Sequence, residues 1–188
     1  MLRFDDPLPL RPMRVLVGGV SGTGKTTLAK RIARMVDAPH TEIDALYHGP
    51  DWAPRETFID DVRAMVGEER WTTEWQYASA RPILAERAEL FVWLDLPFTT
   101  VTLPRVVCRT LRRRLGHEVL WNGNVEPPLR TFFTDREHIV RWSIATRKKY
   151  RVKLPELEAA RPSLVIVRLR TQQEVEAWLS GPLAQAIR

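Results

Sequence analysis

Residues 13–26 read Met-Arg-Val-Leu-Val-Gly-Gly-Val-Ser-Gly-Thr-Gly-Lys-Thr, a short apolar run followed directly by a glycine-rich segment. The run Met13–Val17 has the profile of a strand buried in a parallel sheet. Residues 19–26 match the pattern G-x-x-x-x-G-K-[ST], which marks a phosphate-binding loop when a strand precedes it and a helix follows. The helix is indicated by apolar side chains at helical spacing before Pro39, namely Leu28, Ile32, Met35 and Val36.

The glycine-rich segment has the chemistry of a polyphosphate cradle. Glycines let backbone N–H groups curl around the anion, because a Cβ would block the positive φ angles that the curl needs. Lys25 is expected to bridge the β and γ phosphates and the Thr26 hydroxyl to ligate Mg²⁺. A nucleoside triphosphate is the implied ligand, and the alternative is a chance glycine-rich turn. The residues expected to hold the phosphates are Gly19, Ser21, Gly22, Thr23, Gly24, Lys25, Thr26 and Thr27.

Length and composition narrow the class of protein. A chain of 188 residues with 44% hydrophobic and 28% charged residues suits a single domain over residues 1–188, and neither a disordered chain nor a coiled coil. Cys108, the only cysteine, cannot form an intramolecular disulfide. The segment Met1–Arg14 contains two aspartates and three prolines where a signal peptide needs an apolar run. No apolar stretch approaches the roughly 20 residues of a membrane helix. We therefore expect a cytoplasmic protein without a membrane partner.

The charge is basic and unevenly distributed. The net charge is +6, and only five of the 29 basic residues are lysines. Two blocks without acidic residues, Phe98–His117 and Ile139–Leu154, hold five and six basic residues. This balance favours anionic partners, because the guanidinium group matches phosphate oxygens. The alternative is solvated surface charge from a coding bias toward arginine.

Further strands and helices alternate along the chain. Strands are expected at 40–43, 71–74, 90–94 and 164–169. Helices are expected at 55–66 and 104–115, from the capping box of Thr134 and Glu137 through Tyr150, and after the capping pair Thr171 and Glu174. This alternation predicts an α/β protein whose parallel strands are joined by right-handed crossovers.

Three further motifs resemble a known group of proteins. They are Asp44-Ala-Leu-Tyr-His-Gly-Pro-Asp-Trp52, Trp93-Leu-Asp-Leu-Pro97 and Trp121-Asn-Gly-Asn-Val-Glu126. They look like the P-loop kinases related to adenylate kinase that are often labelled DNA topology modulation proteins. The likeness runs from about Arg14 to Leu179 and leaves residues 1–12 as an N-terminal extension. It implies a three-layer P-loop NTPase fold of adenylate-kinase type, with a five-stranded parallel sheet, a helical lid and ATP as phosphoryl donor.

One segment departs from that group. The related sequences carry Trp-x-x-Asp-Gly-Asn-Tyr, whereas this chain has Trp71-Thr-Thr-Glu-Trp-Gln-Tyr77. Trp75 in place of glycine removes backbone freedom and adds a large ring where an acceptor could approach. We hypothesise a changed or closed acceptor pocket, with Trp52 and Trp75 as the tryptophans to test as its walls.

Three carboxylates are candidates for the site. Asp44 follows the expected second strand and could orient an acceptor hydroxyl, or it could be a turn or helix-cap residue. Glu74 ends the third strand, where a carboxylate supports Mg²⁺ through water; the alternative is a surface glutamate. Asp95 ends the run Leu90–Leu94, and we rank it lower because it more simply caps the turn before the next helix.

Arginines are candidates for neutralising the transferring group. Arg105, Arg109 and Arg112 share one helix face. Arg109 and Arg113 are the phosphate candidates here, and Arg105 and Arg114 are expected to be solvated. Arg147 is the candidate from the second basic block, and Arg81 is a weaker candidate for an acidic group on the acceptor.

The segment at about 116–130 has little periodicity and is long for a plain connection, which indicates a lid-like loop; the alternative is an ordered loop pinned by Leu120 and Trp121. The four histidines are too dispersed to predict a zinc site. The resulting hypothesis is a kinase that uses ATP and Mg²⁺ and phosphorylates a small-molecule acceptor, of which a nucleotide or nucleoside-like compound is one candidate. The rivals are a nucleotide-regulated nucleic-acid-binding protein, disfavoured because no recognition motif is visible, and a non-catalytic P-loop module. The sequence does not indicate the oligomeric state.

Overall fold

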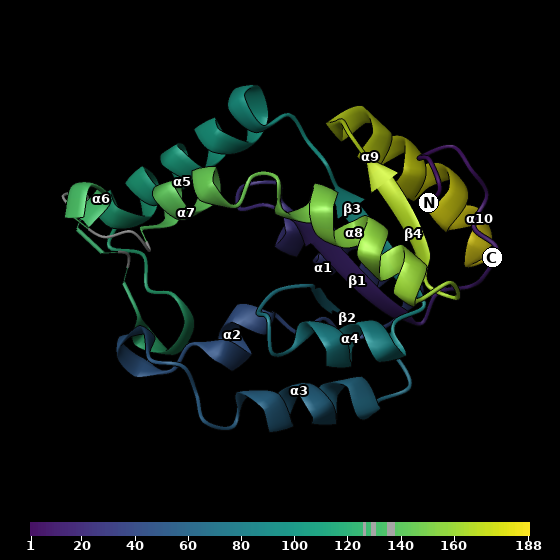
Figure 1. Cartoon of the computed structure of the whole chain (residues 1–188), viewed down its shortest axis with the longest axis horizontal. Coiled ribbons are helices and arrows are strands. Elements are labelled where there is room, and N and C mark those ends of the chain that lie inside the picture. Colours follow the sequence, from purple (N-terminus) through teal and green to yellow (C-terminus); the bar gives the residue numbers. More distant parts are fainter. Residues whose placement is uncertain (126, 129–130, 135–137) are drawn as a thin grey trace.

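The computed structural model describes residues 1–125, 127–128, 131–134 and 138–188. Its sheet has four parallel strands in the order β2-β1-β3-β4 (Figure 1). The strands are β1 (Arg14–Gly19), β2 (Trp71–Glu74), β3 (Leu90–Leu94) and β4 (Val165–Leu169). The strands expected from the sequence at these places are confirmed, and β1 and β3 lie in the centre of the sheet.

The helices connect these strands and cover both faces of the sheet. They are α1 (Lys25–Val36), α2 (Ile43–Tyr47), α3 (Phe58–Gly67), α4 (Arg81–Arg87), α5 (Leu103–Leu115), α6 (Thr131–Thr134), α7 (Ile139–Ala145), α8 (Lys149–Ala160), α9 (Gln172–Trp178) and α10 (Ala184–Ala186). Short 3-10 turns lie at Pro50–Trp52 and Trp121–Gly123, and π-helical turns at Phe98–Thr102 and Leu179–Leu183.

The strand residues alternate between two hydrophobic cores. Leu16 packs with side chains of α3, α4 and α8 on one face, whereas Val15 and Val17 pack with side chains of α1 and α9 on the other. All three are fully buried. The result is the expected three-layer α/β arrangement, from which α5, α6 and α7 project as an arm (Figure 1).

The prediction of a fifth strand at 40–43 is wrong for the described chain. The segment makes one parallel bridge, His40 to Thr72, and then turns into α2 at Ile43. The reason lies at the end of β2, because the Glu74 carboxylate accepts a hydrogen bond from the Ile43 N–H at 3.2 Å. That donor is therefore unavailable to extend a ladder, and the segment becomes the entrance to a helix.

The N-terminal extension covers the outer edge of the sheet. The Leu2 N–H donates to the Ile166 carbonyl at 2.6 Å, and the Arg168 N–H donates to the Leu2 carbonyl at 3.0 Å. Leu2, Phe4 and Leu8 also pack against the core on the α9 side. Residues 1–12 thus protect the open edge of β4, which would otherwise present unpaired backbone groups.

The helix expected from Thr134 through Tyr150 is wrong as one element, because residues 146–148 form a turn between α7 and α8. The Thr146 hydroxyl donates to the Trp142 carbonyl at 2.8 Å, and Arg147 donates to the Ile144 carbonyl at 2.7 Å. These side chains satisfy carbonyls of the last turn of α7, which lets the helix end there. The predicted cap partner Glu137 lies outside the described residues.

Two other helix predictions are confirmed in place, with small shifts at their ends. The helix expected at 104–115 is α5, and the one expected at 55–66 is α3, which begins at Phe58. The final helix starts as expected, since the Thr171 hydroxyl accepts from the Glu174 N–H at 3.0 Å. Within the described residues, no helix has both the length and the apolar character needed to cross a bilayer.

Candidate active site

The glycine-rich loop lies between β1 and α1 and has the backbone that a phosphate cradle needs. Gly22 and Gly24 have φ angles of +84° and +88°, in the left-handed region that disfavours side chains. A Cβ on Gly22 would lie 2.5 Å from the Thr102 carbonyl oxygen. The Thr23 hydroxyl donates to the Val20 carbonyl at 2.8 Å and holds the curl of the loop. The first amides of α1 follow directly, so the positive end of this helix meets the loop.

Lys25 lies inside the loop, and its Nζ donates to the Val20 carbonyl at 3.3 Å. Burial of the ammonium group is the main reason that the pKa of Lys25 is lowered to about 8. The negative charges of Asp44 and Glu74 raise this pKa, and the positive charge of Arg109 lowers it. A polyphosphate in the loop would supply the negative charge that this buried cation lacks. The geometry therefore fits the triphosphate expected from the motif.

Glu74 is the most enclosed carboxylate near the loop, with 1% of its surface exposed. One oxygen accepts from the Ile43 N–H, and the other lies 3.2 Å from His40 Nε2. The Thr26 side chain also hydrogen-bonds to it. Burial alone would raise the pKa of Glu74, but these contacts together lower it. The carboxylate therefore stays ionised next to the Thr26 hydroxyl.

A hydroxyl and an ionised carboxylate in contact form a donor set that suits Mg²⁺, which prefers oxygen ligands and keeps several waters. Thr26 and Glu74, the two residues predicted for the metal, are thus brought together by α1 and β2. No cluster of three or more His, Cys, Asp or Glu side chains able to hold a metal is present in the described ranges. This pair therefore suits an ion that arrives with a nucleotide.

Asp44 lies in the first turn of α2. The prediction that it directly follows a strand is wrong, because the segment before it does not form a strand. Its Oδ1 accepts from the Tyr77 hydroxyl at 2.6 Å and from Gln76 Nε2 at 2.9 Å. Its charge acts on Lys25 across the site. Two fixed donors therefore orient this carboxylate close to the loop lysine.

The sequence analysis missed the residues that hold Asp44. The Tyr77 hydroxyl also lies 3.1 Å from His48 Nε2, and the Tyr77 ring stacks on Tyr47 with 3.8 Å between centroids. Burial, reinforced by the charge of Asp44, raises the pKa of the Tyr77 hydroxyl well above its usual range. It therefore remains a hydrogen-bond donor. The sequence contained a signal for both residues. Tyr77 is the last residue of the segment 71–77, which departs from the resembled sequences, and His48 lies in the motif of residues 44–52.

Arg109 is the predicted arginine that the structure places nearest the loop. It lies on α5, and its charge contributes to the lowered pKa of Lys25. Arg105, expected to be solvated, is exposed on the same helix.

Arg113 and Arg147 have other contacts. Arg113 stacks on the Trp121 ring with 5.8 Å to the centroid, and its Nε lies 3.5 Å from Glu118. Arg147 is exposed in the turn after α7, where it donates to the Ile144 carbonyl. Of the three predicted arginines, Arg109 acts on the loop lysine, Arg113 lies at the arm, and Arg147 lines a cavity together with Val20 of the loop.

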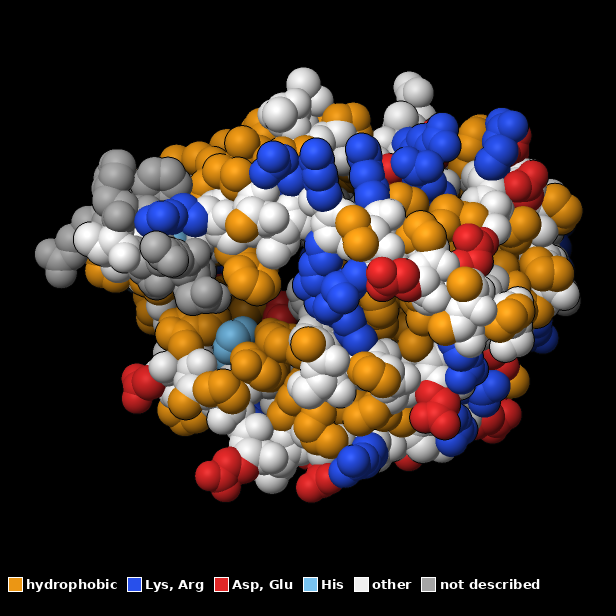
Figure 2. Space-filling view, in the orientation of Figure 1, with side chains coloured by type: hydrophobic (Ala, Val, Ile, Leu, Met, Phe, Trp, Pro, Cys, Tyr) orange, Lys and Arg blue, Asp and Glu red, His pale blue; other side chains and the backbone are white. Residues whose placement is uncertain are grey.

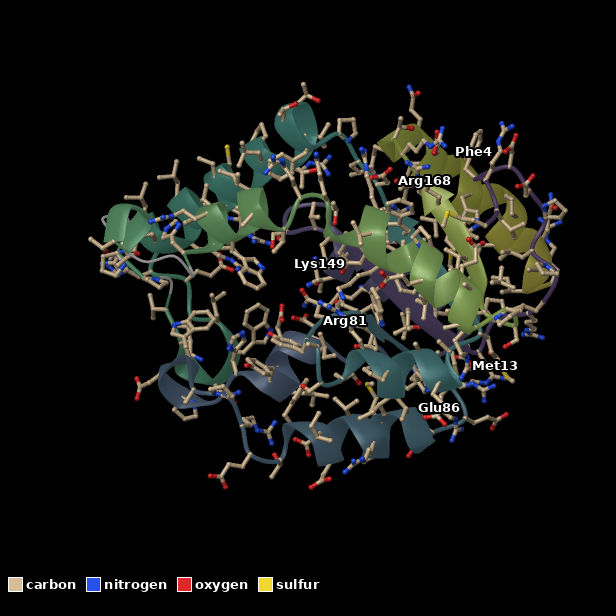
Figure 3. The ribbon with its side chains drawn as sticks, in the orientation of Figure 1. Phe4, Met13, Arg81, Glu86, Lys149 and Arg168 are labelled. Carbon is tan, nitrogen blue, oxygen red and sulfur yellow. The ribbon has the colours of Figure 1, made fainter. Side chains whose placement is uncertain are left out.

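Asp95, the carboxylate that we ranked lower, forms ion pairs with arginines. It does not cap the turn before the next helix as we expected. Its carboxylate accepts from Arg168 Nε at 3.0 Å and from Arg151 Nε at 3.4 Å. Arg168 in turn lies over the Trp93 ring at 4.6 Å (Figure 3). Asp95 thus fastens α8 to the ends of β3 and β4.

The lid-like segment is fastened to the segment after α2. Asn124, which is 5% exposed, accepts from the Trp52 N–H at 2.9 Å and donates to the Gly49 carbonyl at 2.8 Å. Trp121 Nε1 donates to Glu42 at 2.8 Å. Two motifs that are far apart in the sequence therefore meet in space. The described part of the segment is an ordered loop pinned by Trp121 and Asn124.

The Trp75 ring lies in the core rather than in a pocket wall. It is 5% exposed and packs edge-on against Phe91 with 5.3 Å between centroids. Arg81 covers its other side, with 5.0 Å from the guanidinium carbon to the ring centroid. Of the two tryptophans considered as acceptor walls, Trp52 alone lies outside the core.

A cavity of ≈ 470 Å³ opens beside the loop at the carboxyl ends of β1 and β3. It is lined mainly by apolar side chains, with basic residues at its rim. Its lining includes Val20, Trp93, Asp95, Leu96, Phe98, Arg147 and Tyr150. Its volume is in the range of small-ligand sites, and ligands of open α/β sheets bind at this edge.

Comparison with known proteins supports the fold. No protein-family model matches the chain, and no curated protein matches it. A gluconokinase structure from Sinorhizobium meliloti 1021 is 20% identical, with 94% of this chain and 95% of that chain covered and a TM-score of 0.54. This similarity shows that the chain shares the α/β fold of that protein.

Two other solved structures are more weakly similar. A sugar kinase from Janibacter sp. HTCC2649 is 23% identical over 94% of this chain and 100% of that chain, with a TM-score of 0.48. A shikimate kinase from Bacteroides thetaiotaomicron is 14% identical over 90% and 95%, also with a TM-score of 0.48. None of the three is described as a DNA topology modulation protein, so the resemblance to that group stays a prediction.

Proposed function

We propose that this protein is a phosphotransferase that uses Mg-ATP and phosphorylates a small-molecule acceptor. One observation carries the proposal: the buried Lys25 of the glycine-rich loop is influenced by two carboxylates, Glu74 and Asp44, that different elements fix in place. A kinase needs one group for the metal and another for the acceptor hydroxyl.

The donor side of the proposed reaction rests on the loop and its surroundings. The loop amides and Lys25 bind the phosphates, and Arg109 adds positive charge beside Lys25. Thr26 and Glu74 hold Mg²⁺ when it is bound, where it neutralises charge on the transferring group. Glu74 is itself held by Ile43 and His40, so its position does not depend on the ligand.

The acceptor side rests on Asp44. Its carboxylate accepts the hydrogen bond of the acceptor hydroxyl and takes its proton as the oxygen attacks the γ-phosphorus. Tyr77 and Gln76 both donate to Oδ1, which leaves Oδ2 for the acceptor. The segment 116–130 is proposed to act as a lid, because Asn124, in its described part, bonds to Gly49 and Trp52 of the segment that follows Asp44. Arg113 and Arg147 would reach the phosphates from the arm during closure.

The fold is compatible with this reaction, since one solved protein that shares it is a gluconokinase. The proposal is tested by ADP release from Mg-ATP with a panel of hydroxyl-bearing metabolites, including nucleosides and nucleotides. One class should stimulate turnover, and both Lys25→Met and Asp44→Asn should lose at least about 100-fold. Arg63→Met, an exposed residue of α3, serves as the control.

Two results would contradict the proposal. If Mg-ATP gives no heat of binding, the loop is not a nucleotide site. If the protein binds DNA with steep salt dependence and no acceptor stimulates turnover, the rival class of nucleic-acid-binding proteins is favoured. Asp44→Asn should leave the affinity for ATP within about threefold, because Asp44 is assigned to the acceptor and not to the phosphates.

A further inference from the structure

Two cations face the centre of the molecule from opposite sides. Arg81 begins α4 and Lys149 begins α8, and Figure 3 shows their side chains close together between these helices. Figure 2 shows basic side chains lining the hollow at this place. The Arg81 Nε is buried and has no hydrogen-bond partner within the described residues. Neither cation forms an ion pair with an acidic residue in the described ranges.

The charges that act on Lys149 are all positive. Burial, together with the charges of Arg81, Lys25 and Lys153, lowers the pKa of Lys149 to about 8. Burial also lowers the pKa of Arg81. Like charges that are gathered and desolvated are destabilised until an anion joins them. The loop lysine is among these neighbours, so the pair adjoins the phosphate cradle.

Aromatic rings lie against both cations. The Lys149 Nζ lies 6.0 Å from the centroid of the Trp142 ring. Trp75 positions Arg81. Its ring lies beneath the Arg81 guanidinium, and its Nε1 donates to the Arg81 carbonyl at 3.3 Å. Its own carbonyl accepts from the Tyr150 hydroxyl at 3.0 Å, which fixes the residue next to Lys149. A glycine at position 75, as in the resembled sequences, would offer neither the ring nor the indole N–H. The residue that departs from the resembled pattern is therefore the one that positions Arg81.

We propose that Arg81 and Lys149 bind an anionic group of the acceptor, a carboxylate or a phosphate, on the platform of Trp75. This inference rests on the proposed function and specifies its substrate class: a hydroxylated acid or a phosphorylated alcohol, not a neutral sugar or nucleoside. The anionic group binds the cation pair while the hydroxyl binds Asp44. Arginine supplies a planar fork and lysine a point charge, a combination that accepts either anion.

The first experiment compares matched acceptors, namely hydroxy acids with their amides and phosphate esters with their parent alcohols. The anionic member of each pair should have the higher kcat/KM. Arg81→Met and Lys149→Met should each raise its KM by about 10- to 100-fold and leave the affinity for ATP within about threefold. Arg87→Met, exposed at the end of α4, and Arg63→Met are the controls. Equal efficiency for the neutral partners would overturn the inference and leave the proposed kinase function standing.

The second experiment needs no turnover. The protein is saturated with Mg²⁺ and a non-hydrolysable ATP analogue, so that the β- and γ-phosphate positions of the loop are occupied, and is titrated calorimetrically with inorganic phosphate and, separately, with succinate. We expect one further anion per chain, lost in Arg81→Met and Lys149→Met and retained in both controls. Preference for phosphate or succinate distinguishes the two acceptor classes. Binding that persists in both variants refutes the inference. If the anion binds as expected but no acceptor is phosphorylated, the anion site stands and the kinase proposal fails.

Discussion

Replacing Glu74 by glutamine tests whether the buried carboxylate supports the metal or only the fold. Glu74 contacts Ile43 N–H, His40 and Thr26 and is 1% exposed. Glutamine has the same shape, and its amide oxygen can still accept from the Ile43 N–H. Its NH₂ group can donate to His40, whose ring nitrogen can serve as acceptor. The substitution therefore removes the charge and leaves most contacts in place.

The structural cost follows from those contacts. Two or three hydrogen bonds lose their charge assistance, at about 1 kcal/mol each, so the free energy of unfolding should fall by about 2–3 kcal/mol. For a chain of this length the melting temperature falls by roughly 4–12 °C. The functional cost is of similar size, because a carboxylate that orients metal ligands is typically worth about 10- to 100-fold in metal affinity. The Mg²⁺ concentration needed for ATP binding should rise by that factor.

The pH dependence gives a second readout of the same residue. The pKa of Glu74 is lowered in the folded protein from its ordinary value of 4.5, so the folded state binds this proton less readily than the unfolded state does. Its contribution to stability is present above about pH 4.5 and is lost as the pH falls through the folded-state pKa. Glu74→Gln should therefore flatten the acid limb of the stability curve.

The assay combines thermal unfolding between pH 3 and 8 with calorimetric ATP titrations at graded Mg²⁺ concentrations. Glu56→Gln, at an exposed position before α3, is the matched control and should match the wild type in both. The reasoning is refuted if Glu74→Gln binds ATP with the wild-type Mg²⁺ requirement. A lowered melting temperature with an unchanged Mg²⁺ requirement would assign Glu74 to the fold alone.

Three other predictions address the loop, the lid and the anion site. Gly22→Ala should weaken ATP binding at least about tenfold, because its Cβ would lie 2.5 Å from a carbonyl at a φ of +84°; Gly67→Ala, with open space around it, should not. Asn124→Ala should lower stability by about 2–3 kcal/mol and speed hydrogen exchange at the Trp52 amide, which donates to Asn124. For anionic acceptors, KM should rise as the pH passes about 8, where Lys149 loses its proton, and this rise should vanish in Lys149→Met. A pH profile of KM from 6 to 9.5 measures it.

The parts of the fold that could be predicted are those whose determinants are adjacent in sequence. The strand, loop and helix of residues 14–36 follow from apolar spacing and from glycines at Gly22 and Gly24, where the backbone has positive φ. The cap at Thr171 is likewise local, because donor and acceptor are three residues apart. No distant contact is needed to select these conformations, so pattern and propensity were sufficient.

The errors arose where a distant side chain or a local hydrogen bond competes with propensity. The segment 40–43 has the composition of a strand, but Glu74, 31 residues beyond Ile43, takes the N–H that would begin its ladder. The helix expected through Tyr150 ends early because Thr146 and Arg147 satisfy carbonyls of its last turn. Periodicity does not report either competition, since the apolar pattern is the same whether or not the backbone donor is already occupied.

The same distinction separates the residues of the candidate site that the sequence could predict from those that it could not. Lys25, Thr26 and Glu74 could be selected because each lies at a strand end or in a motif, whereas Lys149 was passed over for Arg147 in the same basic block. Helical spacing could not decide between the two, because the turn at 146–148 changes which face each residue presents. The break leaves Arg147 exposed and turns Lys149 toward Arg81 and Lys25. The helix break that periodicity missed therefore also determines which cation of the block reaches the site.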